Sequence, residues 1–131
     1  MRAIGVTSLL LLCCSSILFV SAQLRGPEPA VFNNAETYGA YTMTQTDTVI
    51  TFDTTQSNSN SVVLYTCDSN NGGQLVYIID LGGDASTNNI AITASGTDTL
   101  RGQSSLSIAT NYGSALLMCD SNGHWVGHFT G

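Results

Sequence analysis

The chain of 131 residues has no lysine and only three arginines, against nine aspartate and glutamate residues. Charged side chains make up 9% of the sequence, and the formal net charge is −6. Proteins that bind a nucleic acid or an anionic membrane neutralise its phosphates with clustered lysine and arginine side chains. The lack of cations therefore argues against both functions. Serine, threonine and asparagine supply the polar surface instead, which suits hydrogen bonding to sugars or to further copies of the chain.

No segment after residue 22 shows the apolar period of an amphipathic helix. Instead, short apolar and β-branched segments recur about every eight to twelve residues, with Gly, Asn and Asp turns between them. The strongest segments are 48–52, 61–67, 74–81, 89–94, 105–109, 115–120 and 124–129. This pattern predicts an all-β fold for residues 41–131, namely a small antiparallel β-sandwich or barrel-like domain of about eight short strands.

Two parts of the chain depart from simple alternation. Segments 61–67 and 74–81 are apolar at successive positions, which is typical of central strands that are buried on both faces. Residues 23–40 contain both prolines and no periodicity, so they are predicted to form an extended N-terminal arm before the β-domain.

The first 22 residues have the features of a secretory signal peptide. Arg2 precedes apolar runs at 9–12 and 17–20, and Ala22 ends a small-residue site suited to cleavage before Gln23. A transmembrane anchor is the alternative, but the apolar run is shorter than the roughly 20 residues that a span needs. We therefore expect a secreted, extracellular protein without membrane insertion after signal cleavage.

The sequence contains four cysteines, and two of them lie inside the predicted signal peptide. The remaining pair, Cys67 and Cys119, predicts one disulfide in an oxidising compartment. Each cysteine begins the same tetrapeptide, Cys-Asp-Ser-Asn. If the two strands that end there are neighbours, the cysteines face each other, which favours an internal bridge over an intermolecular bridge or free thiols. Closing a loop of this length would stabilise the fold by roughly 4 kcal/mol.

No group of residues has the spacing of a catalytic or metal site. His124 and His128 are four residues apart, about 13 Å along a strand, which is too far for one metal ion. Asp80, Asp84 and Asp98 could approach one another and hold calcium, but they lack the spacing of a calcium loop. We therefore predict no catalytic residue, no metal, no cofactor and no enzyme activity.

Trp125 and Tyr112 are the candidates for contact with a ligand. An exposed tryptophan beside asparagine and histidine is typical of a platform on which a sugar ring stacks. The alternative is that Trp125, which alternates with Phe129, fills the core, and that alternation favours the core position.

Several segments of the C-terminal half occur in an order that is found in a known family. They are 78–80 (Ile-Ile-Asp), 85–92, 102–106 (Gly-Gln-Ser-Ser-Leu), 112–114 (Tyr-Gly-Ser) and 120–125. In this order they resemble the C-terminal β-module of tail-fibre and spike-like structural proteins of phages and large algal viruses. The resemblance, over about half of the chain, implies a structural or adhesive β-domain in a trimeric assembly. It also implies that the outer end binds a cell surface or a carbohydrate.

The chain departs from that family's pattern, which usually has lysine at the position of Ile79 and lacks paired cysteines and a signal peptide. The resemblance and the signal peptide together imply a structural or adhesive module that is secreted or lies on a virion surface. We expect this module to form a homo-oligomer, preferably a trimer, and to contact a cell-surface glycan without catalysis. The alternative is a monomeric, lectin-like carbohydrate-binding protein. A trimer would bury an apolar sheet face, whereas a lectin would show an exposed aromatic ring in a groove.

Overall fold

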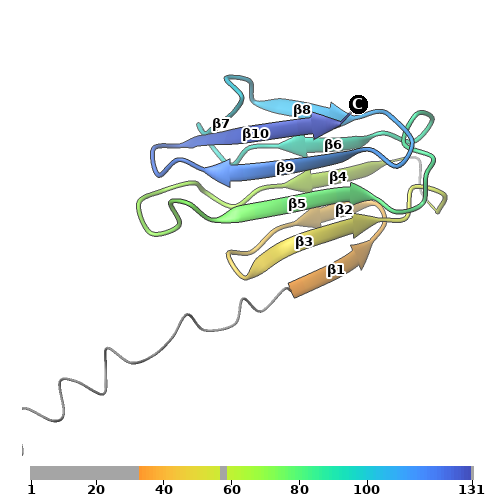
Figure 1. The fold of residues 1–131 in the computed structure, drawn as a ribbon, viewed down its shortest axis with the longest axis horizontal. Helices are drawn as coiled ribbons and strands as arrows, with labels where there is room; N and C mark the ends of the chain where they lie inside the picture. Colours follow the sequence, from red (N-terminus) through yellow and green to blue (C-terminus); the bar gives the residue numbers. More distant parts are fainter. Residues whose placement is uncertain (1–32, 57–58, 131) are drawn as a thin grey trace, which may run out of the picture. The chain divides into compact units, whose positions relative to one another are not determined.

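The computed structural model describes residues 33–56 and 59–130, and this part of the chain folds into ten β-strands without a helix (Figure 1). The predicted signal peptide lies outside the described residues. Within the described ranges, no helix is long and apolar enough to cross a membrane. The strands are β1 (Asn33–Thr37), β2 (Ala40–Thr42), β3 (Asp47–Phe52), β4 (Asn60–Val63), β5 (Leu75–Asp80), β6 (Ile90–Thr93), β7 (Thr99–Leu100), β8 (Ser105–Ile108), β9 (Ser114–Cys119) and β10 (His124–Thr130).

The ten strands form two sheets. The six-stranded sheet, called sheet A below, has the order β1-β3-β5-β9-β10-β7, and the four-stranded sheet B has the order β2-β4-β6-β8. From β1 to β6 the chain passes alternately from one sheet to the other, so the strands within each sheet pair in parallel. Strands β8 and β9 then pair antiparallel with β6 and β5, and β10 pairs antiparallel with β9.

The prediction of an all-β fold in two layers is confirmed, but the predicted antiparallel pairing holds for only part of the structure. Five of the eight strand pairs are parallel. Apolar periodicity shows where a strand lies and which face is buried, but it does not show which strand is the neighbour. Short connections between strands of different sheets therefore look like hairpin loops in the sequence.

Strand β1 lies inside the range that was predicted to be an extended arm. It pairs in parallel with β3 over Asn33–Thr37 and forms the edge of sheet A. The sheet therefore includes Asn33–Thr37, ahead of the predicted boundary at Tyr41. The sequence Asn-Asn-Ala-Glu-Thr has no apolar alternation, so only backbone pairing with β3 makes it a strand, and side-chain pattern could not have revealed it.

The core lies between the two sheets. In β5, β6 and β9, for example, the side chains at alternate positions point inward and are almost fully buried. The largest fully buried side chains of the described residues are Ile50, Phe52, Val62, Leu64, Val76, Ile78, Ile90, Ile92, Leu100, Ile108, Leu117 and Trp125. The rings of Trp125 and Tyr65 meet edge to face, with centroids 5.1 Å apart. This geometry is favourable for aromatic pairs and fixes the tryptophan inside the core.

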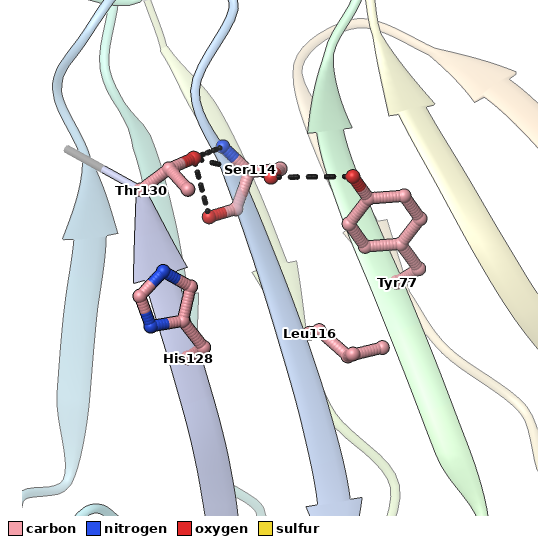
Figure 2. A pocket seen from close by; sticks show the side chains of 5 residues that line it. All are labelled: Tyr77, Ser114, Leu116, His128 and Thr130. Atoms are coloured by element: carbon pink, nitrogen blue, oxygen red, sulfur yellow. Dashed lines mark hydrogen bonds between the residues drawn. The ribbon is translucent and has the colours of Figure 1, made fainter.

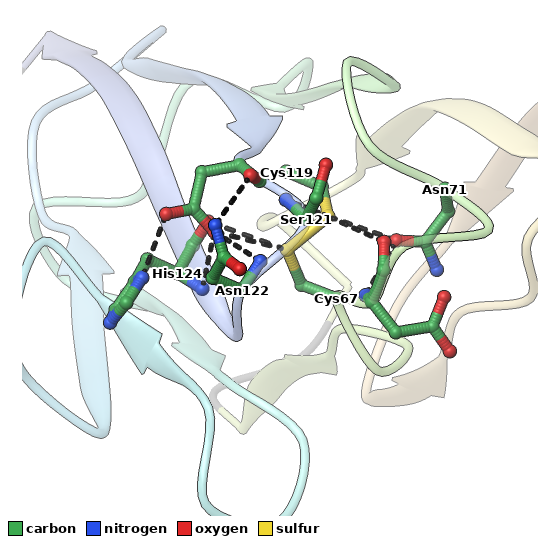
Figure 3. Close-up of polar contacts among 8 residues, drawn as sticks. Cys67, Asn71, Cys119, Ser121, Asn122 and His124 are labelled. Carbon is green, nitrogen blue, oxygen red and sulfur yellow. Dashed lines mark hydrogen bonds and ion pairs between the residues drawn. A yellow bond between two sulfur atoms is a disulfide. The ribbon is translucent and has the colours of Figure 1, made fainter.

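The predicted disulfide between Cys67 and Cys119 is present, with a Cα–Cα distance of 5.4 Å. It joins the segment after β4 of sheet B to the last residue of β9 in sheet A. Figure 3 shows the turns that follow the two cysteines close to each other. The backbone N–H of Cys67 donates to the Asp98 carboxylate at 2.7 Å, and the Cys67 carbonyl accepts from Gly123 N–H at 3.0 Å. The bridge and these bonds hold the two sheets together at this end of the domain.

Candidate functional site

The outer face of sheet A is apolar although it faces solvent. In β5 the buried residues Val76 and Ile78 alternate with Leu75 and Tyr77, which are 53% and 38% exposed. In β9 and β10 the outward residues are Leu116, Met118 and Val126, each 40% to 45% exposed. These five outward side chains are called the apolar face below: Leu75, Tyr77, Leu116, Met118 and Val126. They account for five of the nine exposed large hydrophobic side chains in the part of the chain that the structure describes.

Strand register brings the apolar face into two rows. Met118 lies opposite Leu75 of β5 and opposite Val126 of β10. Leu116 lies opposite Tyr77 on one side and opposite His128 on the other. Directly opposite residues in antiparallel strands have Cβ atoms about 5 Å apart, so their side chains touch across the strands. The apolar side chains therefore form one continuous surface and not scattered exposed residues.

A hollow of about 400 Å³ lies over one end of this surface, lined by Tyr77, Ser114, Leu116, His128 and Thr130 (Figure 2). Its polar groups bond mainly to one another. The Thr130 hydroxyl oxygen accepts the backbone N–H of Ser114 at 2.7 Å, and the Tyr77 hydroxyl donates to Ser114 Oγ at 3.4 Å. The hollow therefore presents mostly ring and aliphatic carbon, with the His128 imidazole beside it.

Charged groups lie at the end of these strands and outside the two rows. Asp120 lies in the turn before β10, and its Oδ2 is 2.7 Å from His124 Nδ1. The backbone N–H of Asn122 and the contact with His124 hold the pKa of Asp120 below its usual range. The rows themselves contain no aspartate, glutamate or arginine, although the chain carries a net charge of −6.

Asp80 organises the opposite end of the domain, at the end of β5. It is 1% exposed, and its carboxylate accepts from the Thr54 hydroxyl at 2.6 Å and from the backbone N–H groups of Gly83, Ala85 and Tyr112 at 2.8, 3.1 and 2.9 Å. Burial alone would raise the pKa of Asp80, but these four hydrogen bonds outweigh burial and lower it. A carboxylate with all of these donors is held ionised, and its role is to fix three loops.

One of the loops fixed by Asp80 carries Tyr112, which the sequence had suggested as a ligand contact. Tyr112 is 73% exposed and has a φ angle of 60°. Its ring lies directly against Gly83, where an added Cβ would come within 2.2 Å of Tyr112 Cζ. The backbone bond to Asp80 and the contact with Gly83 together hold the ring outward in one position.

Trp125, the other proposed ligand contact, is fully buried. Its suggested role as an exposed platform is therefore wrong, and the core position indicated by its alternation with Phe129 is correct. The sequence expectation for metals concerned His124, His128 and three aspartates. Among the residues that the structure describes, no group of three or more His, Cys, Asp or Glu side chains could hold a metal ion.

Sequence reasoning missed the apolar face. Segment 74–81 was interpreted as a strand buried on both faces, whereas Leu75 and Tyr77 are exposed. In β9, Leu116 and Met118 likewise make the sequence apolar at successive positions, so that both faces of the strand are apolar. Two such strands side by side in a thin two-layer fold were the available sign of an exposed apolar surface.

A scan of protein-family models finds no match to the chain, and a comparison with curated proteins finds no similar sequence.

Proposed function

We propose that this chain is a secreted structural module that assembles with further copies of itself through the apolar face of sheet A, without catalysis. The observation that carries the proposal is the continuous surface formed by Leu75, Tyr77, Leu116, Met118 and Val126. Large exposed apolar patches of this kind mark interaction sites, because covering them removes apolar area from water. The internal disulfide supports an oxidising, extracellular setting.

A second copy of the chain is the partner that fits this surface. The molecule is acidic, so most parts of its surface repel another copy at low salt. The two rows of the apolar face carry no carboxylate, so two copies can meet there without placing like charges in contact. A homo-oligomer is the assembly we propose, and a trimer is the form that the resemblance to tail-fibre modules implies.

Light scattering of the purified mature protein, with and without reductant, tests the proposal. We expect an oligomer, and we expect it to survive reduction because the disulfide lies within one chain. A monomer at every concentration would overturn the proposal. A dimer that reductant dissociates would show that intermolecular bridges, and not the apolar face, hold the copies together.

A matched pair of variants locates the interface. Leu116→Thr removes an apolar side chain from the middle of the apolar face, and Val63→Thr makes a comparable change on the outer face of sheet B, where Val63 is 37% exposed. Threonine keeps a high preference for strands, so both variants should fold. We expect Leu116→Thr to weaken assembly about tenfold and Val63→Thr to leave it unchanged. Equal effects of the two would contradict an interface on sheet A.

A second candidate function is binding of a carbohydrate by the monomer, and Tyr112 favours it. The exposed ring is held outward by Asp80 and Gly83, and a rigid aromatic face can stack on the CH groups of a sugar. The test is a glycan array with the wild type and Tyr112→Asn, since asparagine tolerates a positive φ angle. Loss of a binding signal in Tyr112→Asn but not in Tyr38→Asn, which changes another exposed tyrosine, would support this function. Absence of any binding, or equal loss in both variants, would contradict it.

A further inference from the structure

Of the two histidines in the sequence, His128 belongs to a row of the apolar face. It lies directly opposite Leu116, and Figure 2 shows its ring on the same side of the sheet as Tyr77 and Leu116. We infer that assembly through this face is controlled by pH, and that protonation of His128 separates the copies. This inference rests on the proposed function, because it assigns a regulatory group to the same surface.

Among the residues that the structure describes, none in the two rows or the hollow offers His128 a partner for a positive charge. Across the strand pair lie Leu116 and, beyond it, the ring and hydroxyl group of Tyr77 of β5. Within the hollow, the other neighbours are the hydroxyl groups of Ser114 and Thr130. An imidazolium at this position would therefore face apolar carbon and hydroxyl groups, with no carboxylate in either row.

The other charged groups near β10 lie outside the two rows of the apolar face. The Arg101 guanidinium lies 5.8 Å from the centre of the Phe129 ring, and Phe129 packs against the core. Strand β7 pairs only with the first two residues of β10, His124 and Trp125. Asp120 and His124 form their pair at that same end of β10. Of the described carboxylates, Asp120 is thus already paired with the other histidine, and Asp98, beside Gly123 at the same end of β10, accepts the backbone N–H of Cys67.

The direction of the pH effect follows from desolvation. In the separated chain His128 is exposed to water, so either protonation state is hydrated. In the assembly a second copy would cover it, and covering an unpaired cation is far more costly than covering a neutral imidazole. The assembly therefore binds fewer protons than the free chains, so acid favours dissociation. Assembly is expected to be strongest where the imidazole is neutral, and to weaken as the pH falls and His128 takes up a proton.

Linkage gives the size of the effect. Each copy contributes one His128, so each interface histidine adds one proton to the dissociation reaction at low pH. The dissociation constant should then rise by up to about tenfold per pH unit and per histidine as the pH falls through the acidic range. A trimer that covers three such side chains would show up to three times this slope on a logarithmic scale.

The experiment is to measure the mass of the full mature chain by light scattering between pH 8 and 5, over a range of concentrations. Three proteins are compared: the wild type, His128→Gln and His124→Gln. Glutamine keeps a polar side chain that cannot take up a proton. Circular dichroism at each pH shows whether the chain remains folded, so that dissociation is distinguished from unfolding.

We expect the wild type and His124→Gln to dissociate as the pH falls, and His128→Gln to remain assembled at pH 5. Assembly of the wild type that does not depend on pH would overturn the inference and leave the proposed function standing. Loss of the pH effect in His124→Gln, with its persistence in His128→Gln, would overturn the assignment to His128. A wild type that is monomeric at every pH would overturn the proposed function itself, and this inference with it.

Discussion

The outer faces of the two sheets are built on the same fold and differ sharply in composition. On sheet B the outward residues are small or carry hydroxyl groups, and strand register arranges them in two rows; they are Ala40, Thr42, Ser61, Val63, Ala91, Thr93, Ser105 and Ser107. We call these eight side chains the small-residue face. On sheet A, the apolar face has leucine, methionine, tyrosine and valine at the equivalent outward positions. Both sheets bury aliphatic side chains on their inner side.

The difference between the two outer faces shows which outward side chains folding requires and which it does not. The small-residue face shows that a sheet of this domain is stable with serine, threonine and alanine pointing outward. Leucine and methionine at the outward positions of β5 and β9 are therefore not needed to form the two layers. Together with Tyr77 and Val126 they cover three adjacent strands, β5, β9 and β10, and this is what points to a partner for sheet A.

The largest loss of unfolding free energy should come from removing the disulfide, which joins sheet B to sheet A. We expect the double variant Cys67→Ala, Cys119→Ala to lose about 4 kcal/mol of unfolding free energy, because the bridge closes a loop of 52 residues. Urea unfolding followed by circular dichroism measures this. A loss below about 1 kcal/mol would show that packing and hydrogen bonds alone hold the two sheets together at this end.

The next largest effect is expected at Asp80, where the loops between the sheets are fixed. Asp80→Asn removes the charge and turns an amide N–H₂ group toward groups that are themselves donors. Leaving buried donors unsatisfied should cost about 2 kcal/mol of unfolding free energy. Because the loops fixed by Asp80 lie between the two sheets, Asp80→Asn should lower the stability of the whole domain. It should not alter one outer face more than the other. Thr55→Ala, which changes an exposed hydroxyl in a nearby loop, serves as the control.

The same residue gives a pH dependence with a definite sign. The pKa of Asp80 is lower in the folded chain than its ordinary value. Its contribution to stability is therefore fully present above the unfolded pKa of about 4, and is lost as the pH falls through the folded pKa. Wild-type stability should decline more steeply below pH 4 than that of Asp80→Asn. Parallel curves for the two proteins would show that Asp80 does not stabilise the fold as an ion.

The sequence allowed the inner side of each strand to be predicted better than the outer side. In β6, Ile90 and Ile92 alternate with small residues, so the buried face could be named correctly from the sequence alone. In β5 every position from 75 to 79 is apolar, and alternation cannot then distinguish a strand covered on both faces from one with an exposed apolar face. Tyr112 was identified as a candidate contact, but its fixation by Asp80, 32 residues away in the chain, depends on the tertiary fold.

Within the apolar face, a gradient of smaller effects is expected. Leu116 lies on the middle strand of the face, between Tyr77 of β5 and His128 of β10, whereas Val126 lies at the margin, on the last long strand of the sheet. Residues at the centre of an interface contribute most of its energy, and those at the rim contribute less. We therefore expect Leu116→Thr to weaken assembly about tenfold and Val126→Thr about threefold, as measured by sedimentation over a concentration series. A larger effect at Val126 would move the centre of the interface toward β7.

The smallest effect is expected for Val63→Thr, and it tests the comparison most directly. Val63 lies opposite Thr42 and Thr93, so a threonine at position 63 would continue a row of hydroxyl-bearing, β-branched side chains. The site is 37% exposed, and a change between two good strand formers there should alter the unfolding free energy by less than about 0.5 kcal/mol. Assembly should not change, since sheet B has no part in it. If Val63→Thr instead reduced the mass in solution while its unfolding curve matched the wild type, the small-residue face would also be an interface. The two outer faces would then make two different kinds of contact: an apolar contact on sheet A, and close packing of small side chains on sheet B.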